Sequence, residues 1–517
     1  MSGARELPHP TLEAGGSADV ALLLEGTYPY VRGGVSAWVH HLVRGLPELT
    51  FSIVFIGGSR ERRGDRAYEL PPNVVHLEEH FLETPRVSEA PRDLPGDAGF
   101  FAASAALHDG FRAGAGTATL SAALDTVVEH LVANPERCRR DFLYSRSAWK
   151  EITERYAAGA PTRSFLEYFW TVRSMHAPLF ALAAAAARVP PARVLHVVST
   201  GFAGFLATLL RRRRGSPLII TEHGIYTKER RIELLQADWI FDDERLGPDT
   251  SDVSVGYFRQ LWIGLFERIG RMTYEAADSI VSLYEGNRQR QIADGAPPAR
   301  TSVLPNGIAL ERFRALRARR PAEIPPVIAL IGRVVPIKDI RTFIRAARLV
   351  IARRPEVEAW IAGPEEEEPD YAAECRELAA GPGGSQGRIK LLGFQRVDEI
   401  FPRIGVNVLT SISEAQPLVV LEGFAAGVPC VATDVGCCRE LIEGTTPDDR
   451  ALGAAGAIVQ IADPEATAAR IIELLDDPAR WRAAQQAGIA RVERLYTEEL
   501  MLQRYRDLYR ASFAPES

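Results

Sequence analysis

The sequence predicts an α/β protein with two successive domains, each built from a parallel sheet whose strands alternate with helices. Short apolar runs followed by helical periodicity recur in the first part of the chain, and the same alternation restarts after the Arg- and Pro-rich stretch ALRARRPAEIPP. The strand runs are almost continuously apolar, as is typical of parallel strands covered by helices on both faces. The 517 residues are enough for two domains of ordinary size and an insertion.

The first domain is expected over residues 18–318. Its regular alternation is interrupted over about residues 80–190, where apolar residues recur at helical spacing, and we expect a helical insertion there. The aromatic residues of the insertion are predicted to be core. The strands of this domain are predicted at Val20–Leu24, Phe51–Ile56, Val194–Val198, Leu218–Thr221, Ser279–Ser282 and Thr301–Leu304.

The second domain is expected over residues 319–492. Residues 493–517 are predicted to form an amphipathic helix that returns to brace the first domain. The strands of the second domain are predicted at Val327–Ile331, Glu358–Ala362, Ile389–Leu392, Val406–Leu409, Cys430–Thr433 and Ala457–Val459.

Two glutamates stand eight residues apart in the run SEAQPLVVLEGFAAGVPC of the second domain. Pro417 suits the first turn of a helix between two strands, and Gly427 suits its end. Glu414 then lies in the loop after a strand and Glu422 in the helix, at the sheet edge where ligands bind in open α/β folds. The pair could act as acid and base in glycoside cleavage, bind a phosphate- or hydroxyl-rich ligand at the helix N-terminus, or be solvated charges.

Two cations follow the first predicted strand of the second domain, in the loop GRVVPIKD. The guanidinium of Arg333 offers a planar fork and the ammonium of Lys338 a point charge, which together suit a diphosphate. Either residue alone could be a surface charge. Their presence in one domain with the glutamate pair favours a diphosphate clamp.

The first domain offers weaker candidates. Gly33 and Gly34 lie between a strand and a helix, where backbone N–H groups could approach an anion, although such a pair is more often a simple turn. His223 follows a predicted strand end, where a histidine could be structural or could bind a sugar. Arg211–Arg214 end an apolar helix and either complement its C-terminus or contact an anionic membrane; the first interpretation is favoured.

Composition excludes several classes of protein. A formal net charge of -6 does not suggest a nucleic-acid partner. No apolar run reaches the roughly 18 residues of a membrane span, and no signal peptide is recognisable, so we expect a cytoplasmic protein. The five cysteines are too few and too irregular for a disulfide scaffold or a metal site. No D-x-D stands at a strand end in the expected way, and no metal is expected.

The motifs S-x-x-E, P-L-V-V-L-E and G-V-P-x-V-A-T-D-V-G around the glutamate pair resemble the E-x7-E signature of retaining nucleotide-sugar glycosyltransferases of family four. From about Val20 to Tyr509 the chain further resembles the glycosyltransferases of Pel exopolysaccharide synthesis, through EGTYPYVRGGVSAWVH, HVVSTGFAG, TEHGIYTKERRIE, GRVVPIKDIRTFI and AGPEEEEPDY. The resemblance implies the GT-B architecture, in which two Rossmann-like domains face each other across a cleft.

Carried over to this sequence, the family pattern implies roles for the second-domain residues. Arg333 and Lys338 would hold the donor diphosphate, Glu422 the ribose hydroxyls, and Glu414 the hydroxyls of the transferred sugar. The family loop usually has glycine after the lysine, where this chain has Asp339. That departure leaves the shape of the loop open.

Other donor contacts are expected at Leu418 and Val419, at the start of the helix, and at Phe394, where a base could lie against the backbone. His223 would contact the sugar, and the turn at Gly33 and Gly34 would approach the phosphates.

The resemblance implies a retaining, metal-independent enzyme without a cofactor that moves a hexose or N-acetylhexosamine from UDP-glucose or a UDP-N-acetylhexosamine to a growing exopolysaccharide. Inner-membrane polysaccharide synthase subunits are the expected partners, with the chain peripheral at that membrane. Two alternatives stay open: a UDP-sugar epimerase of the same architecture, and a non-catalytic scaffold of a membrane synthase.

Overall fold

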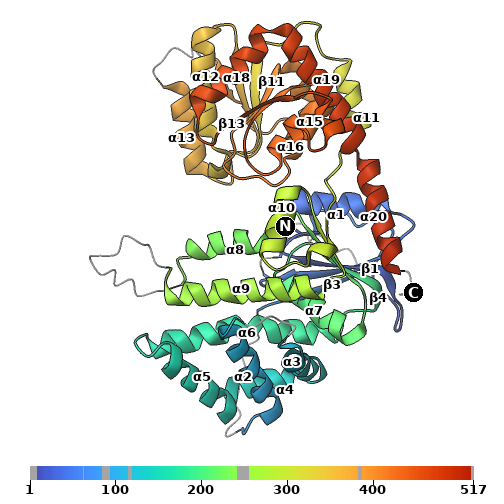
Figure 1. The fold of residues 1–517 in the computed structure, drawn as a ribbon, viewed down its shortest axis with the longest axis vertical. Coiled ribbons are helices and arrows are strands. Elements are labelled where there is room, and N and C mark those ends of the chain that lie inside the picture. The colour runs from blue at the N-terminus through green and yellow to red at the C-terminus, as the bar shows by residue number, and fades with distance from the viewer. Residues whose placement is uncertain are drawn as a thin grey trace, which may run out of the picture. The chain divides into compact units, whose positions relative to one another are not determined.

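The computed structural model describes residues 9–61, 63–83, 94–114, 119–240, 255–381 and 387–513. The chain divides into two compact units (Figure 1). Unit 1 comprises residues 1–282, 288–302 and 506–517, and unit 2 comprises residues 283–287 and 303–505.

Unit 1 is built on a seven-stranded sheet in the order β3-β2-β1-β4-β5-β6-β7. Its central strand, β1, carries the run ADVALLLE and pairs in parallel with β2 on one side and β4 on the other. The order reverses beside β1, which is the arrangement of a doubly wound fold. The strands are β1 (Ala18–Glu25), β2 (Phe51–Gly57), β3 (Val74–Phe81), β4 (Ala192–Val197), β5 (Leu218–Glu222), β6 (Ser279–Ser282) and β7 (Thr301–Val303).

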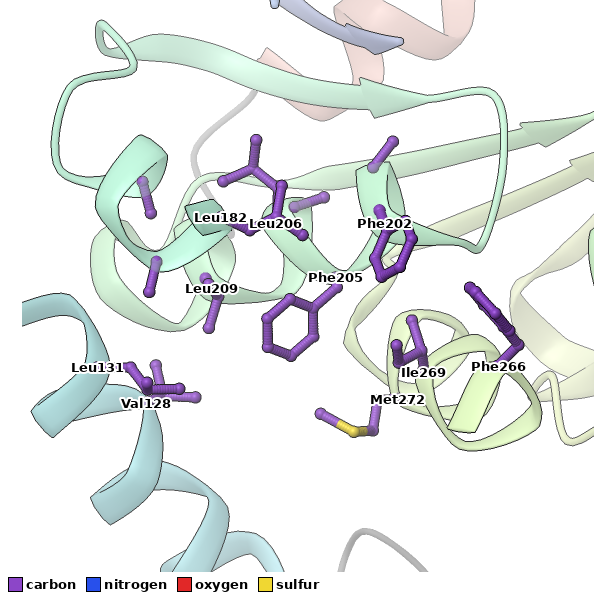
Figure 2. Packing of buried hydrophobic residues seen from close by; sticks show 14 of the residues in the cluster. Val128, Leu131, Leu182, Phe202, Phe205, Leu206, Leu209, Phe266, Ile269 and Met272 are labelled. Carbon is purple, nitrogen blue, oxygen red and sulfur yellow. The ribbon is translucent and has the colours of Figure 1, made fainter. Parts of the chain in front are cut away.

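The expected helical insertion is present in unit 1, and its described residues form five helices. Helix α7 packs between the sheet and insertion helices α3 and α6. Figure 2 shows Leu206 and Leu209 of α7 near Leu182 of α6 and Val128 and Leu131 of α3. The insertion therefore shares one apolar core with the sheet domain. Its helices are α2 (Ala98–Arg112), α3 (Ser121–Ala133), α4 (Pro135–Tyr144), α5 (Arg146–Gly159) and α6 (Phe165–Ala186).

The remaining helices of unit 1 connect its strands. Helices α8 and α9 lie side by side between β5 and β6, and α9 also packs on α7. These helices are α1 (Gly34–Gly45), α7 (Phe202–Arg214), α8 (Tyr226–Leu235), α9 (Tyr257–Ala276) and α10 (Glu285–Ala293), whose first residues belong to unit 2.

Unit 2 has a six-stranded sheet in the order β10-β9-β8-β11-β12-β13, and each of its neighbouring strands pairs in parallel. Alternate residues of β8 enter two separate cores: Val327 and Ala329 one, Ile328 and Leu330 the other. Both faces of this sheet are therefore covered. The strands are β8 (Val327–Ile331), β9 (Glu358–Ala362), β10 (Ile389–Leu391), β11 (Val406–Leu409), β12 (Cys430–Thr433) and β13 (Gly456–Val459).

Helices α12, α13 and α18 cover one face of this sheet, and α11, α15, α16 and α19 cover the other. Their bounds are α11 (Leu310–Arg317), α12 (Ile340–Arg353), α13 (Pro369–Ala380), α14 (Val397–Ile400), α15 (Leu418–Ala425), α16 (Cys438–Glu443), α17 (Pro447–Arg450), α18 (Pro464–Asp476), α19 (Pro478–Leu495) and α20 (Glu498–Phe513).

The division of the structure differs from the expected ranges at two points. The continuous part of unit 2 begins at Val303, before the Arg- and Pro-rich stretch, and α11, which runs into that stretch, packs on α15. At the C-terminus only the part of α20 from Arg506 belongs to unit 1. That part is held by Arg506, which donates to Glu48 over 2.6 Å, and by Tyr509, whose hydroxyl lies 2.7 Å from Nδ1 of His196.

Strand β3 was not expected, because its sequence VVHLEEHF mixes charged and apolar residues.

Within the described parts of the chain, no helix has the length and apolar character needed to cross a membrane.

Candidate functional site

The two glutamates of the E-x7-E run lie in the loop before α15 and in α15 itself, as the sequence predicts. Strands β11 and β12 are parallel neighbours, and α15 connects them. Pro417 occupies the N-cap, one residue before the predicted first turn, and Gly427 follows the last turn with φ 77°. Glu414 lies in the loop after β11 and Glu422 within α15.

The central contact of the site is an ion pair between Lys338 and Glu414. The ammonium of Lys338 donates to Oε1 of Glu414, which also accepts from the hydroxyl of Ser411 over 2.6 Å. The Lys338 and Glu414 side chains are 20% and 13% exposed, so the pair is reached by solvent only at its edge. Strands β8 and β11 are neighbours in the sheet, and their following loops thus bring the predicted cation and the predicted carboxylate together.

Asp339 stands after Lys338, where the family loop usually has glycine. It has φ 44° and ψ 55°, a left-handed conformation that glycine adopts without strain and that aspartate tolerates better than most residues. Its carboxylate also caps α12 by accepting from the backbone N–H of Thr342 over 3.3 Å. The loop therefore keeps a backbone shape suited to glycine while gaining a helix cap.

The loop that carries Glu414 is fixed by backbone contacts on several sides. Ile412 N–H donates to the carbonyl of Ile337 over 2.9 Å, and the hydroxyl of Thr433 donates to the carbonyl of Ser411 over 2.6 Å. On a third side, a Cβ on Gly436 would lie 2.4 Å from the carbonyl oxygens of Glu414 and Ala415. Only a glycine permits this approach.

Glu422 lies half-buried on α15. Burial raises the pKa of its carboxyl, Arg312 opposes that rise and Asp398 adds to it. Its side chain makes no hydrogen bond or ion pair to any residue that the structure describes. This carboxylate is therefore available to accept from a ligand.

Arg333 is not placed against Lys338 or Glu414. One guanidinium nitrogen, Nη1, donates to both carboxylate oxygens of Glu367 at 2.6 Å, and the Arg333 side chain is 54% exposed. The backbone beside it is close-packed, because a Cβ on Gly363 would lie 1.9 Å from the carbonyl oxygen of Gly332. Glu367, in the acidic run EEEE that follows β9, therefore pairs with the candidate clamp residue.

The other predicted donor contacts lie in the same unit. Leu418 and Val419 form the first turn of α15, whose N–H groups have no partner one turn earlier in the helix. Phe394 follows Gly393, whose carbonyl accepts from Gly363 N–H over 2.9 Å, and its ring is 76% exposed. An aromatic ring this exposed can receive a base.

In unit 1, His223 follows β5 as expected. Its ring packs edge-on against Trp38 at 4.6 Å between centroids, and burial lowers its pKa to about 4. Its Nε2 is buried without a hydrogen-bond partner among the described residues. The imidazole is therefore neutral at pH 7 and has one nitrogen free.

Gly33 and Gly34 lie at the start of α1 and are exposed. A Cβ on either would meet nothing within 4 Å, so neither glycine is required by packing. Gly33 is extended, with φ 170°, which other residues also adopt. The local structure therefore supplies no packing reason for this pair of glycines.

Sequence reasoning missed two carboxylates at strand ends of unit 1. Glu222 accepts from the hydroxyl of Tyr274 at 2.5 Å and from Gln291 at 2.9 Å, and Glu25 accepts from the hydroxyl of Tyr226 at 3.0 Å. Burial raises the pKa of each carboxyl. Both residues end strands, at Glu25 of β1 and Glu222 of β5, and a charged residue closing an apolar run is the signal that could have found them.

The arginines Arg211–Arg214 tie α7 to its surroundings. Arg211 pairs with Asp278 at 2.9 Å and Arg212 with Asp125, while Arg214 donates to the carbonyl of Val189 over 2.6 Å. The run forms the last turn of α7, the position that the favoured interpretation assigns to it, and its effect on the helix C-terminus stays a prediction.

No group of three or more potential metal ligands lies together among the described residues. The five cysteines are free and buried, and burial raises the pKa of each thiol. Metal independence of the reaction stays a prediction.

Two family models match the chain. Residues 18–299, more than half of the chain, match a domain of unknown function, DUF3492, and residues 325–477 match the glycosyl transferases group 1. The chain belongs to the DUF3492 family and is a group 1 glycosyltransferase. It is thus an enzyme of the retaining hexosyltransferase class that the motifs indicated.

Curated relatives agree with this assignment. A D-inositol 3-phosphate glycosyltransferase of Thermobispora bispora is 28% identical over 330 residues, which cover 59% of this chain and 70% of the relative. An alpha-maltose-1-phosphate synthase of Mycolicibacterium smegmatis is 27% identical over 324 residues, which cover 59% of this chain and 73% of the relative.

Solved structures confirm the GT-B fold of two Rossmann-like sheets. Anabaena HepE in complex with UDP and glucose superposes with a TM-score of 0.55 at 14% identity, covering 96% of this chain and all of that one. The sucrose-phosphate synthase of Thermosynechococcus elongatus gives a TM-score of 0.56 at 17% identity, and the match covers 96% of this chain and 99% of that one.

Proposed function

We propose that this glycosyltransferase takes its sugar, a hexose or an N-acetylhexosamine, from a UDP-sugar and adds it to a growing exopolysaccharide of the Pel type, as PelF does. The observation that carries the donor half of the proposal is the Lys338–Glu414 pair at the carboxyl ends of the neighbouring strands β8 and β11. It joins the two motifs that the sequence assigned to one ligand. The uridine moiety is supported by the UDP complexes of the HepE structural relative.

In this proposal Lys338 and Arg333 bind the diphosphate. Each must leave an internal carboxylate to do so, Glu414 and Glu367 respectively. Phosphate oxygens are strong acceptors for both cations, and positive charge at this position stabilises the negative charge that grows on the leaving diphosphate. The N–H groups at Leu418 and Val419 add the partial positive charge of a helix N-terminus.

Glu422 would bind the ribose hydroxyls, because its carboxylate has no other partner among the described residues. Glu414, once released from Lys338, would accept from hydroxyls of the transferred sugar. Phe394 would lie against the base, and the neutral His223 would donate or accept one hydrogen bond to the sugar.

The transfer itself retains the anomeric configuration when the acceptor attacks on the face that the diphosphate leaves. The bond between the anomeric carbon and the phosphate oxygen breaks, and the bond to the acceptor oxygen forms. The acceptor's hydroxyl proton passes to the departing phosphate oxygen. No protein nucleophile is needed in this scheme, so Glu414 orients the donor.

The donor is tested by thermal-shift titration of the full chain with a panel of nucleotide sugars, followed by transfer assays with those that bind. UDP-glucose or a UDP-N-acetylhexosamine should raise the melting temperature most, and the product should have retained configuration by NMR. An inverted product would refute the proposed route.

The same assay separates the alternatives. Release of a new UDP-sugar in the absence of acceptor would indicate an epimerase. Absence of nucleotide binding by calorimetry would indicate a scaffold. Association with inner-membrane synthase subunits, and the place of the chain at that membrane, are predictions to be tested by co-purification.

A further inference from the structure

Unit 1 contains a hollow of about 740 Å³ between helices α8 and α9, which residues of α10 and of the end of α2 also line. The two helices run side by side in Figure 1. We call the hollow between them the basic hollow. Each helix lines it with a stripe at helical spacing: Lys228, Arg231, Ile232 and Leu235 from α8, and Gly264, Glu267, Arg268 and Arg271 from α9.

The charges of the basic hollow do not balance. Two of its cations have acidic partners, Arg231 with Glu267 at 3.5 Å and Arg290 with Asp294 at 2.9 Å. Glu267 and Asp294 are the acidic residues among the described part of the lining, and those two pairs use both.

The three remaining cations of the lining are Lys228, Arg268 and Arg271, which have no ion pair with any acidic residue that the structure describes. Like charges repel more strongly in a partly enclosed space than on an open surface, so this arrangement favours an anionic ligand.

The two arginines of α9 are also held in place. The guanidinium of Arg268 lies over the ring of Phe111, 4.8 Å from its centroid, and burial together with the charge of Arg271 lowers its pKa. Arg271 is approached by the loop after α10: its Nε lies 3.0 Å from the position of a Cβ on Gly295, a residue with φ 111°. Cations that are packed in this way lose less side-chain entropy when they bind an anion.

The lining also contains apolar residues. Phe111, Ile232 and Leu235 face the same hollow, and the side chains of Ile232 and Leu235 are 48% and 41% exposed. A volume of this size holds a small organic molecule rather than a single ion. Guanidinium forks recognise phosphate oxygens in pairs.

We infer that the basic hollow is a second ligand site, which binds a molecule carrying at least two phosphate charges next to an apolar portion. Lys228, Arg268 and Arg271 bind the phosphates, and Ile232 and Leu235 contact the apolar portion. The ligand is either a free molecule or the headgroup of an anionic lipid. Gly33, Gly34 and His223 do not line this hollow, and the inference does not depend on the proposed donor.

The test uses the full chain with saturating UDP, so that the proposed donor site is filled. Inorganic pyrophosphate is titrated by calorimetry, and sedimentation measures binding to phosphatidylcholine vesicles with and without phosphatidylglycerol. The variant Arg268→Glu with Arg271→Glu removes the site, and Arg268→Gln with Arg271→Gln keeps a neutral lining in case charge reversal impairs folding. Arg345→Glu with Arg482→Glu changes the net charge equally at two exposed arginines of unit 2.

We expect binding to pyrophosphate or to the anionic vesicles that falls at least tenfold in both basic-hollow variants and stays unchanged in the control. Pyrophosphate binding identifies a free ligand, and vesicle binding identifies a lipid headgroup. Two results would overturn the inference: neither probe binds, or the control variant loses binding as strongly. UDP affinity is measured in each variant, and its retention in the basic-hollow variants separates this site from the donor site.

Discussion

The hydroxyl of Thr410 donates to the backbone carbonyl of Asp339 over 2.9 Å, and so links the loop of Lys338 to the loop of Glu414. The same hydroxyl lies 3.0 Å from the carbonyl of Lys338. The two loops therefore share one buried anchor, and their side chains meet because their backbones are tied together.

The left-handed backbone at Asp339 predicts opposite outcomes for two substitutions. Asp339→Gly relieves the conformation and loses only the side-chain cap, so stability should change by less than about 1 kcal/mol. Asp339→Val loses the cap and forces a β-branched residue to positive φ, which should cost about 2–3 kcal/mol. Chemical denaturation, with the transition of unit 2 followed separately, measures both. Equal effects of the two substitutions would contradict this account.

Arg333→Ala should lower turnover about 10²- to 10³-fold, the usual effect of removing one preorganised charge-stabilising group. Glu367→Ala is the matched control, because it removes the partner of Arg333 and leaves the guanidinium in place. Steady-state kinetics with the UDP-sugar should show near-normal turnover for the control. Near-normal turnover of Arg333→Ala itself would reject the clamp.

Gly436→Ala should disturb the site without unfolding unit 2. The new methyl would meet the carbonyl oxygens of Glu414 and Ala415 at 2.4 Å, so the loop of Glu414 must move. Gly387→Ala is the control, because Gly387 also has positive φ but open space around it. We expect a loss of turnover at least tenfold larger for Gly436→Ala, in proteins with similar melting temperatures. A similar loss in both would assign the effect to backbone strain alone.

The pKa of Glu422 predicts how donor binding depends on pH. Burial raises the pKa of this carboxyl, so the ionised form, which would accept from ribose hydroxyls in the proposed complex, is lost as pH falls, starting above the ordinary range of a glutamate. KM for the UDP-sugar should therefore rise as pH falls. Glu422→Gln should have a high KM that no longer depends on pH in this range. An unchanged pH profile in Glu422→Gln would remove Glu422 from the donor site.

His223 predicts an acid limit on the stability of unit 1. Its pKa is lowered from 6.5 to about 4 by burial, so below pH 6.5 the unfolded chain takes up a proton that the folded chain does not. The stabilisation from this group is complete above pH 6.5 and is lost as pH falls toward 4. His223→Asn cannot take up the proton, and its unfolding free energy should fall less over this interval. NMR of the imidazole should show no titration near 6.5 in the folded protein.

The strands of unit 2 were predictable because their runs are apolar and bounded by turn residues. Val327–Ile331, Glu358–Ala362 and Val406–Leu409 have the predicted ends, and the helix of the glutamate pair ends at the predicted glycine. Local sequence contains the information for such elements.

Contacts between distant loops were less accessible to sequence reasoning. Arg333 with Glu367, and Glu222 with Tyr274 and Gln291, join residues far apart in the chain. A charged residue looks the same in sequence whether it is solvated or paired, because burial and partner are set by packing. The left-handed conformation of Asp339 was likewise not predictable from its residue type, because residues other than glycine rarely adopt it.

The pair of Lys338 and Glu414 also bears on how product leaves. An ammonium that already has a carboxylate neighbour returns to it when the nucleoside diphosphate departs, so dissociation does not leave a bare cation behind. Such an internal competitor weakens substrate and product affinity together. In the proposed donor complex, this competition lowers affinity and speeds the release of product.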